Sequence, residues 1–309
     1  MFENEENQIL ASLNTENPAK SWLIIGEKGI GKSAFSKKLI QKLTKNYNDY
    51  NPSVQWIECG LTDAAKKEIQ KAILAGEKPN EKEWSKKTEI TVDDVRQGCH
   101  FLSLKSNQIK VLVINLADDM NENAQNALLK TLEEPYPNTL ILLLCENIGH
   151  LLPTIKSRCQ QVHLLPPKEA DFVTTLSQKH PHLSADEKQE IQFLSDNIIG
   201  QAEAIIQMDG LEIYHQLVDI LSNPLNPQRI VNFAEQVIQN QKYYLLTTDI
   251  VLKYLSFKAK EATSFSLEKA FDITNLYEKI KHLIQQTDSL NLDKKQTMIT
   301  IIHQIAESL

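Results

Sequence analysis

Cysteine is scarce in this sequence, and its spacing argues against two common uses of the residue. The 309 residues include four cysteines, no two of which form a C-x-x-C pair: Cys59, Cys99, Cys145 and Cys159. Pairs at that spacing are typical of zinc sites, and dense cysteine frameworks are typical of small secreted domains. We therefore expect neither a zinc site nor a disulfide framework.

Basic residues are fewer than acidic residues, and long apolar runs are absent. The chain carries 33 basic and 40 acidic residues, a net charge of −7. A free-standing nucleic-acid-binding protein is usually basic, so any contact with DNA would be shared with partners. No apolar run approaches the ~18 residues of a membrane span, and the opening stretch MFENEENQIL lacks a signal-peptide pattern. We expect a cytoplasmic protein of two or three domains that has no membrane contact.

Arginine is the scarcest charged residue. Only three of the 33 basic residues are arginine: Arg96, Arg158 and Arg229. Arginine differs from lysine in its planar, always-charged fork, which can bind two oxygens of one anion. In a chain that uses lysine by default, each arginine is a candidate for a role that needs this fork.

One motif is complete. Residues 26–33, GEKGIGKS, fit the phosphate-loop pattern G-x-x-x-x-G-K-[ST] at every fixed position. In such a loop the glycines allow backbone turns that aim amide groups at phosphate oxygens, the lysine reaches the outer phosphates and the serine hydroxyl binds Mg²⁺. The candidate nucleotide-binding residues are Gly26, Gly29, Gly31, Lys32 and Ser33. The expected ligand is ATP or ADP with Mg²⁺, and Ser33 would be the magnesium ligand.

The flanks of the motif have the order that a phosphate loop requires. The apolar run SWLII at 21–25 predicts a buried strand that ends at the loop, and residues 32–43 repeat apolar side chains at helical spacing. A chance match in a turn rich in glycine and lysine is the alternative, and these flanks argue against it.

The acidic site that a nucleotide hydrolase needs is degenerate. Such an enzyme usually has Asp-Glu at the end of a later buried strand, where the pair orients Mg²⁺ and polarises water. The run KVLVIN at 110–115 is the candidate strand, and it ends in Asn115-Leu116. Asp118 and Asp119 follow too late, and they are expected to begin the next loop or helix. Asn115 could coordinate weakly through its carbonyl oxygen, whereas Leu116 cannot act as a base.

The alternation of strands and helices predicts the fold class. Short apolar runs alternate with helical patterns in the first half of the chain, which favours an α/β fold with a parallel sheet between helices. The expected strands are 21–25, 54–58, 110–115, 139–145 and 161–165. We interpret residues 76–88, which are highly charged and include Trp84, as a solvated loop or insertion.

Strand signals largely end at Pro166-Pro167, which we interpret as a hinge. Residues 168–208 predict two or three short helices, with Gly200 as a break, and residues from 211 to the end are helical in pattern. Asn-Pro pairs at 223–224 and 226–227 separate helices. The expected domains are 1–166, 167–208 and 209–309.

Two further stretches resemble a known family. NENAQNALLKTLEEPYPNTLILLL at 121–144 reads as a helix, a proline stop and a buried strand, and LLPTIKSRC at 151–159 reads as a short helix ending in Ser-Arg-Cys. With GEKGIGKS and with ITVDDVR at 90–96, these stretches resemble the bacterial clamp-loader members of the AAA+ ATPases, above all the delta-prime subunits of DNA polymerase III. The resemblance covers roughly residues 10–165.

The resemblance implies an AAA+ nucleotide-binding-like domain over 1–166, a helical lid over 167–208 and a helical collar over 209–309. It also implies that Arg158, with Ser157 in the SRC motif, acts as an arginine finger in the ATP site of a neighbouring subunit. A surface arginine that pairs with a local carboxylate is the alternative. The implied partners are the gamma/tau and delta subunits, with the sliding clamp and primed DNA reached through the assembled complex.

Departures from the motor members of this family indicate a subunit that does not hydrolyse ATP. The acidic pair reads Asn115-Leu116, the polar sensor at the end of the fourth strand reads Cys145-Glu146, and Glu203 lies near the place of the sensor arginine. The sequence therefore predicts a stator-like subunit that does not hydrolyse ATP by itself and belongs to a DNA polymerase III complex. The alternatives are an active gamma/tau-like ATPase and an unrelated P-loop NTPase or kinase.

Overall fold

The computed structural model describes residues 2–13, 15, 18–44, 51–59, 89–224 and 226–308. The chain divides into two compact units, with the boundary between Pro166 and Pro167, and each unit is described by itself. The predicted insertion at 76–88, with Trp84, lies outside the described residues. Within the described ranges, no helix is both long and apolar enough to cross a membrane.

The first unit is built on a parallel sheet of five strands in the order β2-β3-β4-β1-β5. Its strands are β1 (Ser21–Ile25), β2 (Val54–Ile57), β3 (Lys110–Ile114), β4 (Thr139–Cys145) and β5 (Gln160–His163). All residues of β1, β3 and β4 are buried, because helices cover both faces of a parallel sheet. The predicted α/β class is confirmed. The predicted run 161–165 is too long at its end, since Leu165 is 68% exposed and lies beyond β5.

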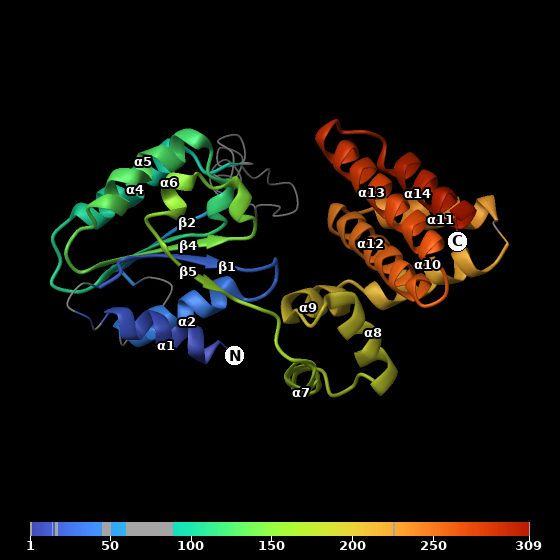
Figure 1. Cartoon of the computed structure of the whole chain (residues 1–309), viewed down its shortest axis with the longest axis horizontal. Helices are drawn as coiled ribbons and strands as arrows, with labels where there is room; N and C mark the ends of the chain where they lie inside the picture. Colours follow the sequence, from blue (N-terminus) through green and yellow to red (C-terminus); the bar gives the residue numbers. More distant parts are fainter. Residues whose placement is uncertain are drawn as a thin grey trace, which may run out of the picture. The chain divides into compact units, whose positions relative to one another are not determined.

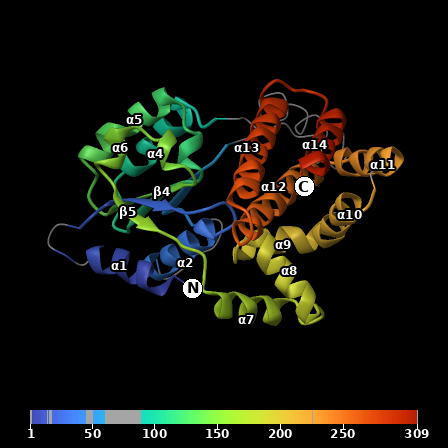
Figure 2. The same cartoon turned by 45° about the vertical axis from the view of Figure 1, so that its right-hand side comes forward.

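Helices lie on both sides of this sheet. The helical segments are α1 (Glu3–Leu13), α2 (Lys32–Thr44), α4 (Val92–Ser103), η2 (Ala117–Asp119), α5 (Glu122–Glu133), η3 (Ile148–His150) and α6 (Pro153–Lys156). Figures 1 and 2 show α1 and α2 on one face and α4, α5 and α6 on the other. The fit of α4 is close: a Cβ on Gly98 would lie 2.7 Å from Ile57 Cδ1 and 2.8 Å from Leu112 Cδ1, both on the sheet.

A buried carboxylate joins the two helices of the opposite face. Glu6 of α1 is 1% exposed, and its two oxygens meet the Nζ atoms of Lys38 and Lys42 on α2 at 3.1 Å and 2.6 Å. Burial acts to raise the pKa of Glu6, but the contacts with Lys42 and Lys38 outweigh it and leave that pKa lowered. Glu6 therefore stays ionised and holds α1 against α2.

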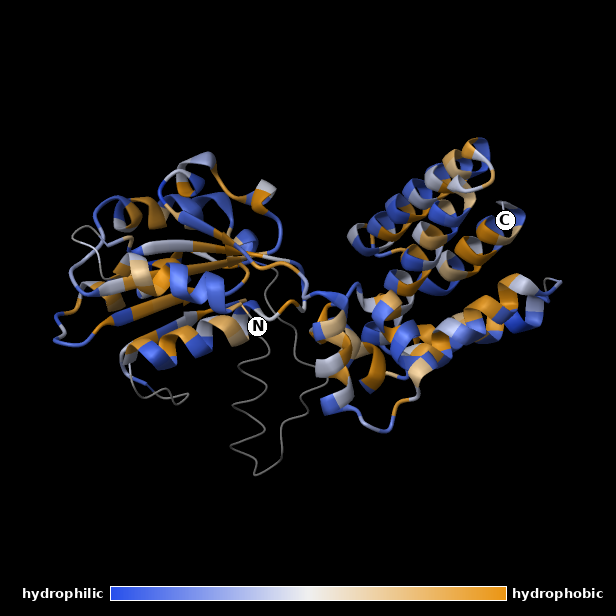
Figure 3. Cartoon of the chain, turned by 60° about the horizontal axis from the view of Figure 1, so that its bottom comes forward, coloured by the Kyte–Doolittle hydropathy of each residue, from blue (hydrophilic) through white to orange (hydrophobic). Residues whose placement is uncertain are grey.

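The second unit is wholly helical over its described residues. Its helices are α7 (Glu169–Lys179), α8 (Ala185–Ser195), α9 (Ile199–Gln207), α10 (Gly210–Ser222), α11 (Pro227–Ile238), α12 (Gln241–Thr263), α13 (Leu267–Ser289) and α14 (Lys294–Ser308). Figure 3 shows polar and apolar residues alternating around them, as helices with one buried face require. This agrees with the predicted helical C-terminal part.

One hydrophobic core runs through the second unit. It extends without interruption from Phe172 on α7 to Ile305 on α14. The same hydrophobic core therefore includes residues on both sides of the predicted boundary at 208/209. That boundary stays a prediction. Gly200 does not break the chain as expected, because it lies in the first turn of α9. The break falls at Asp196 and Asn197, whose φ values of 47° and 62° are left-handed.

Candidate nucleotide-binding site

The sheet order brings three chain segments together at one edge. The strands β3, β4 and β1 are neighbours and parallel, so their carboxyl ends meet at the same edge of the sheet. The phosphate loop follows β1, Asn115-Leu116 follow β3 and Glu146 follows β4. Gly26 N donates to Cys145 O at 3.1 Å, which ties the first residue of the loop to the end of β4.

The loop has the backbone that its glycines permit. Gly29 and Gly31 have φ values of 82° and 104°, a region that side chains disfavour. A Cβ on Gly26 would lie 2.9 Å from Ile30 Cγ2 and 3.0 Å from the carbonyl oxygen of Leu164, so that position has no room for a side chain. The helix α2 begins at Lys32, within the last two residues of the motif, and its N-terminus favours an anion there. These residues fit a phosphate group.

Lys32 makes three hydrogen bonds within the unit. Its side chain is 6% exposed, and Nζ donates to Gly26 O at 2.8 Å, to Glu27 O at 3.1 Å and to Glu146 Oε1 at 3.2 Å. An ammonium group has three N–H donors, so all of them have protein acceptors. The partnership with Glu146 was not predicted from the sequence.

Ser33 lies beside the degenerate acidic site. Its hydroxyl donates to Asn115 Oδ1 at 3.3 Å, and Asn115 Nδ2 donates to Glu58 Oε2 at 3.3 Å. The two predicted oxygen ligands of Mg²⁺ are thus adjacent. Ligands of Mg²⁺ are oxygen atoms, so a hydroxyl and an amide oxygen are suitable donors, although neither carries charge.

The chain turns away from this site directly after Asn115. Leu116 has φ 58° and ψ 60°, a left-handed conformation that is uncommon outside glycine. The turn leads into η2 and places the Asp118 carboxylate at the end of β4, where it accepts from Glu146 N at 3.2 Å and from Asn147 N at 2.8 Å. Asp118 is therefore occupied in holding the β4 end, as the expected start of a loop or short helix implies.

Three of the four cysteines, Cys59, Cys145 and Cys159, are held as neutral thiols. Burial, followed by the nearby Asp118 carboxylate, raises the pKa of Cys145 to about 12. Burial raises the pKa of Cys159 to about 12, and burial with Asp119 raises that of Cys59 to about 11. A thiol must be ionised to act as a nucleophile or metal ligand, so none of the three has that chemistry near neutral pH. Over the described ranges, no group of His, Cys, Asp and Glu is arranged to hold a metal ion.

Arg158 lies just after α6, where the chain enters β5. Its guanidinium is oriented by two elements: Nε donates to Glu133 Oε1 at 2.9 Å, with a second donor, Nη2, on the same oxygen, and Nη1 donates to Thr154 O at 3.0 Å. Ser157 Oγ lies 3.4 Å from Nη1 and donates to Thr154 O. None of these partners belongs to the phosphate loop. The ion pair with Glu133, at the end of α5, is the contact that the alternative interpretation of Arg158 requires.

A buried amide fixes the position of α6. Gln125 on α5 is 4% exposed. Its Nε2 donates to Met120 O at 3.0 Å and His150 O at 3.1 Å, and its Oε1 accepts from Leu152 N at 2.7 Å. Leu152 is the residue before α6, so this single side chain connects α5 to the short helix that leads to Arg158.

In the second unit, Glu203 is engaged by its own neighbours. It lies on α9 and accepts from Lys179 Nζ and from His180 Nε2, each at 3.0 Å. Burial acts to raise the pKa of Glu203, but these hydrogen bonds outweigh it and leave that pKa lowered. The carboxylate is therefore ionised and balances the positive charge of Lys179. In motor subunits, the resemblance implies an arginine near this position.

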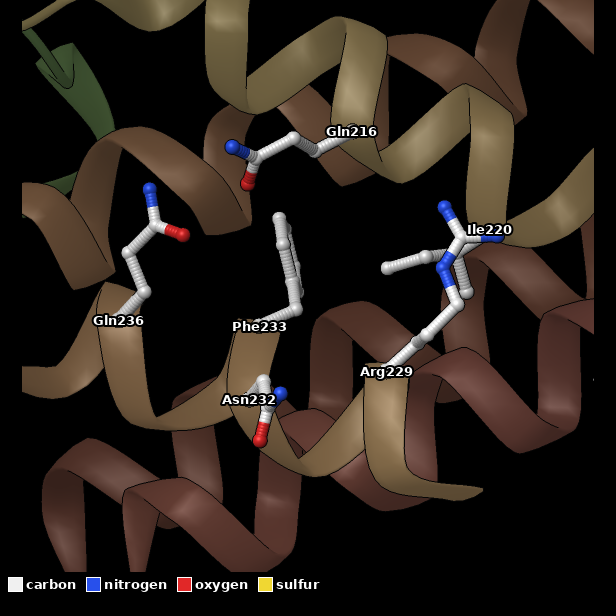
Figure 4. A pocket seen from close by; sticks show the side chains of 6 residues that line it. All are labelled: Gln216, Ile220, Arg229, Asn232, Phe233 and Gln236. Atoms are coloured by element: carbon white, nitrogen blue, oxygen red, sulfur yellow. The ribbon is translucent and has the colours of Figure 1, made fainter. Parts of the chain in front are cut away.

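A concavity between α10 and α11 has few side chains that could take part in catalysis. It has a volume of about 230 Å³ and is lined by side chains of both helices (Figure 4). Its one charged lining residue, Arg229, forms an ion pair with Asp219. The rest of the lining is amide and apolar, so we assign no catalytic role to this concavity.

The parallel sheet, the glycine loop between β1 and α2, and the helical second unit give the chain the α/β fold of an AAA+ domain followed by a helical part. A solved structure supports the fold: a DNA polymerase III gamma subunit-related protein from Thermotoga maritima has a TM-score of 0.56 and 21% sequence identity, over 99% of this chain and 98% of that one. At that identity the similarity concerns the fold alone.

The family follows from comparison of sequences. A family model described as DNA polymerase III, delta subunit, matches residues 3–168, just over half of the chain. The DNA polymerase III subunit delta' of Pseudomonas aeruginosa is 34% identical over 184 residues, which cover 57% of this chain and 52% of that protein. The subunit delta' of Haemophilus influenzae is 35% identical over 173 residues, covering 55% and 48%.

The chain belongs to the DNA polymerase III delta subunit family, and the predicted resemblance to delta-prime subunits is confirmed. The chain spans about half the length of the curated relatives that it matches. The matched region contains the phosphate loop, Asn115-Leu116 and Arg158.

Proposed function

We propose that this chain is a non-hydrolysing, stator-like subunit of a DNA polymerase III clamp loader. It would work beside gamma/tau and delta subunits in a ring that uses ATP to place the sliding clamp on primed DNA. Its own phosphate loop would hold ATP or ADP weakly or serve only as a structural element, and Arg158 would act in the ATP site of a neighbour. Membership of the delta subunit family supports this proposal.

The end of β3 is the observation on which the non-hydrolysing role depends. Hydrolysis needs a carboxylate or equivalent group to polarise water, and Asn115-Leu116 supply an amide and an alkyl group. The following acidic residue, Asp118, already accepts two backbone N–H groups at the β4 end. Moving it to the loop would leave the half-buried N–H of Glu146 without a partner, which costs up to about 1–3 kcal/mol, whereas the exposed N–H of Asn147 could bind water.

A first experiment is steady-state ATP turnover by the isolated chain. We expect turnover indistinguishable from a Lys32→Ala variant, since no group at Asn115-Leu116 can activate water. Turnover that exceeds the Lys32→Ala background would contradict the non-hydrolysing role.

An active, gamma/tau-like subunit is the second candidate, and one contact favours it. Glu58, which follows β2, is exposed, and its Oε2 lies 3.3 Å from Asn115 Nδ2. It could bring a carboxylate to the Ser33–Asn115 pair from the neighbouring strand. If the isolated chain hydrolyses ATP and Glu58→Gln abolishes that turnover, this candidate replaces the stator-like role.

The geometry of Arg158 is compatible with action in trans. A guanidinium has five N–H donors. Glu133 accepts one N–H from Nε and one from Nη2, and Thr154 O accepts one from Nη1. Each terminal nitrogen therefore keeps a second N–H that is available for a weak contact or for an incoming anion. The side chain is 33% exposed. Glu133 would then orient the fork while its outer edge meets the γ-phosphate of the neighbour.

The decisive experiment compares variants in reconstituted complexes. Arg158→Ala should leave assembly intact and slow DNA- and clamp-stimulated ATP hydrolysis, because a trans arginine finger is worth about 10³–10⁵ in rate at its own site. The loss for the whole ring would be smaller, since other sites keep their own arginines. Arg158→Lys should rescue poorly, because an ammonium cannot bind two phosphate oxygens through one planar fork.

Two controls separate the finger from the ion pair. Lys156→Ala removes a nearby positive charge on α6, whose Nζ donates to Ile148 O, and it should slow ATP hydrolysis far less than Arg158→Ala. Glu133→Gln weakens the ion pair but retains the guanidinium. Equal rates for wild type and Arg158→Ala would leave Arg158 as the partner of Glu133, and the trans role would be wrong.

A further inference from the structure

We propose that Glu146 sets the nucleotide affinity of the phosphate loop by occupying the lysine that an outer phosphate must bind. This inference rests on the proposed function, in which the loop takes nucleotide without hydrolysing it. It assigns an affinity-determining role to a residue outside the phosphate-loop motif.

The contacts of Lys32 carry the inference. Its three donors are all used, and two of the acceptors, Gly26 O and Glu27 O, are backbone groups of the loop itself. Glu146 supplies the third acceptor and the only charge among them. An incoming phosphate oxygen must therefore replace an acceptor, and Glu146 is the one that can leave by side-chain rotation.

Burial makes this replacement unfavourable. Lys32 is 6% exposed, so little water competes for its charge, whereas Glu146 is 31% exposed and can reach solvent when displaced. The ion pair would be lost at the moment of binding. The displaced carboxylate would also remain close to the phosphate, and like charges at short distance repel. Both effects weaken the binding of a nucleotide whose outer phosphates approach Lys32.

The backbone holds Glu146 in place for this role. Asp118 accepts the N–H of Glu146, and Cys145 O accepts the N–H of Gly26, so the end of β4 is fixed to both η2 and the loop. Because β4 and β1 are hydrogen-bonded neighbours, the carboxylate and the lysine meet although 114 residues separate them.

The test is the dissociation constant of Mg²⁺–ADP, measured by calorimetry on the full chain. Glu146→Gln should tighten binding by about five- to tenfold, the scale expected for a partly exposed ion pair together with the repulsion it removes. Glu134→Gln removes the same charge at an exposed position at the end of α5 and should leave the affinity at the wild-type value. In a Lys32→Ala background, Glu146→Gln should give a smaller gain, because the ion pair is already absent and only the repulsion between the carboxylate and the phosphate is removed.

Each outcome has a defined meaning. No gain in Glu146→Gln, an equal gain in Glu134→Gln, or an undiminished gain of Glu146→Gln in the Lys32→Ala background would overturn the inference. Absence of detectable binding in both wild type and Glu146→Gln would overturn it too, since another feature would then keep nucleotide from the loop. Phosphate release from ATP is measured on the same samples: turnover above background contradicts the proposed function, whereas an unchanged affinity contradicts only the role of Glu146.

Discussion

Replacing Gln125 by methionine should loosen the connection between α5 and α6. Methionine has a similar size but no hydrogen-bonding amide, so Met120 O, His150 O and Leu152 N would each lose a partner. A buried polar group without a partner costs about 1–3 kcal/mol, but His150 is exposed and its carbonyl can bind water. We therefore expect a loss of about 2–4 kcal/mol in the free energy of unfolding of the first unit.

Tryptophan fluorescence makes this loss measurable in the full chain. Two of the three tryptophans, Trp22 on β1 and Trp56 on β2, lie in the sheet of the first unit, so their emission reports that unit. With a urea dependence of about 1–3 kcal/mol per molar, the urea midpoint should fall by roughly 1–2 M. Circular dichroism in the far ultraviolet follows the helices of both units, and the part of its transition that comes from the second unit should not move.

The control for this prediction is Gln97→Met on α4. Gln97 is exposed, so the same chemical change there should leave the midpoint nearly unchanged. If Gln125→Met and Gln97→Met unfold at the same urea concentration, the three hydrogen bonds of Gln125 do not stabilise the unit, and its proposed part in holding the α6 segment is wrong.

Two further predictions concern the same unit. Because the folded pKa of Glu6 is lowered, its stabilising contribution is fully present above its ordinary pKa of 4.5 and is lost as pH falls through the folded value. The difference in the free energy of unfolding between wild type and Glu6→Gln, from urea unfolding, should therefore narrow as the pH falls below 4.5. A difference that stays constant there would exclude the ion pair with Lys38 and Lys42 as its source. Gly98→Val should lower the free energy of unfolding by about 1–3 kcal/mol, because the valine side chain would overlap methyl groups of β2 and β3. An unchanged urea midpoint would show that α4 can move away from the sheet.

Much of the fold follows from local patterns in the sequence. The run 21–25 and the glycine loop predict β1 and the start of α2, because a buried parallel strand is apolar throughout and a glycine-rich turn ends it. These sequence patterns misplace the end of an element where residue type and local structure disagree. The apolar Leu165 extends the expected strand past its end although it is exposed. Gly200 suggests a break, but Asp196 and Asn197 make it, since both residue types tolerate left-handed backbone.

The candidate site was predictable only where its residues share a motif. The phosphate-loop residues are adjacent in sequence, and their roles follow from spacing. The ion pair of Lys32 with Glu146 depends on β4 lying beside β1, and the pattern of apolar runs does not give the order of strands in a sheet. Similarly, the pairing of Arg158 with Glu133 depends on how α5 ends beside α6, although a local carboxylate partner was the stated alternative.

The left-handed turn at Leu116 limits what an acidic residue at this position could do. A glutamate at 116 would inherit φ 58°, whose cost of roughly 1–3 kcal/mol Leu116 already bears, and its carboxylate would leave from a turn rather than from a continuing strand. The adjoining turn also positions Asp118 to secure the end of β4. An acidic pair at 115 and 116 would therefore require changes in the backbone turn and in the contacts of Asp118, and not in the two side chains alone.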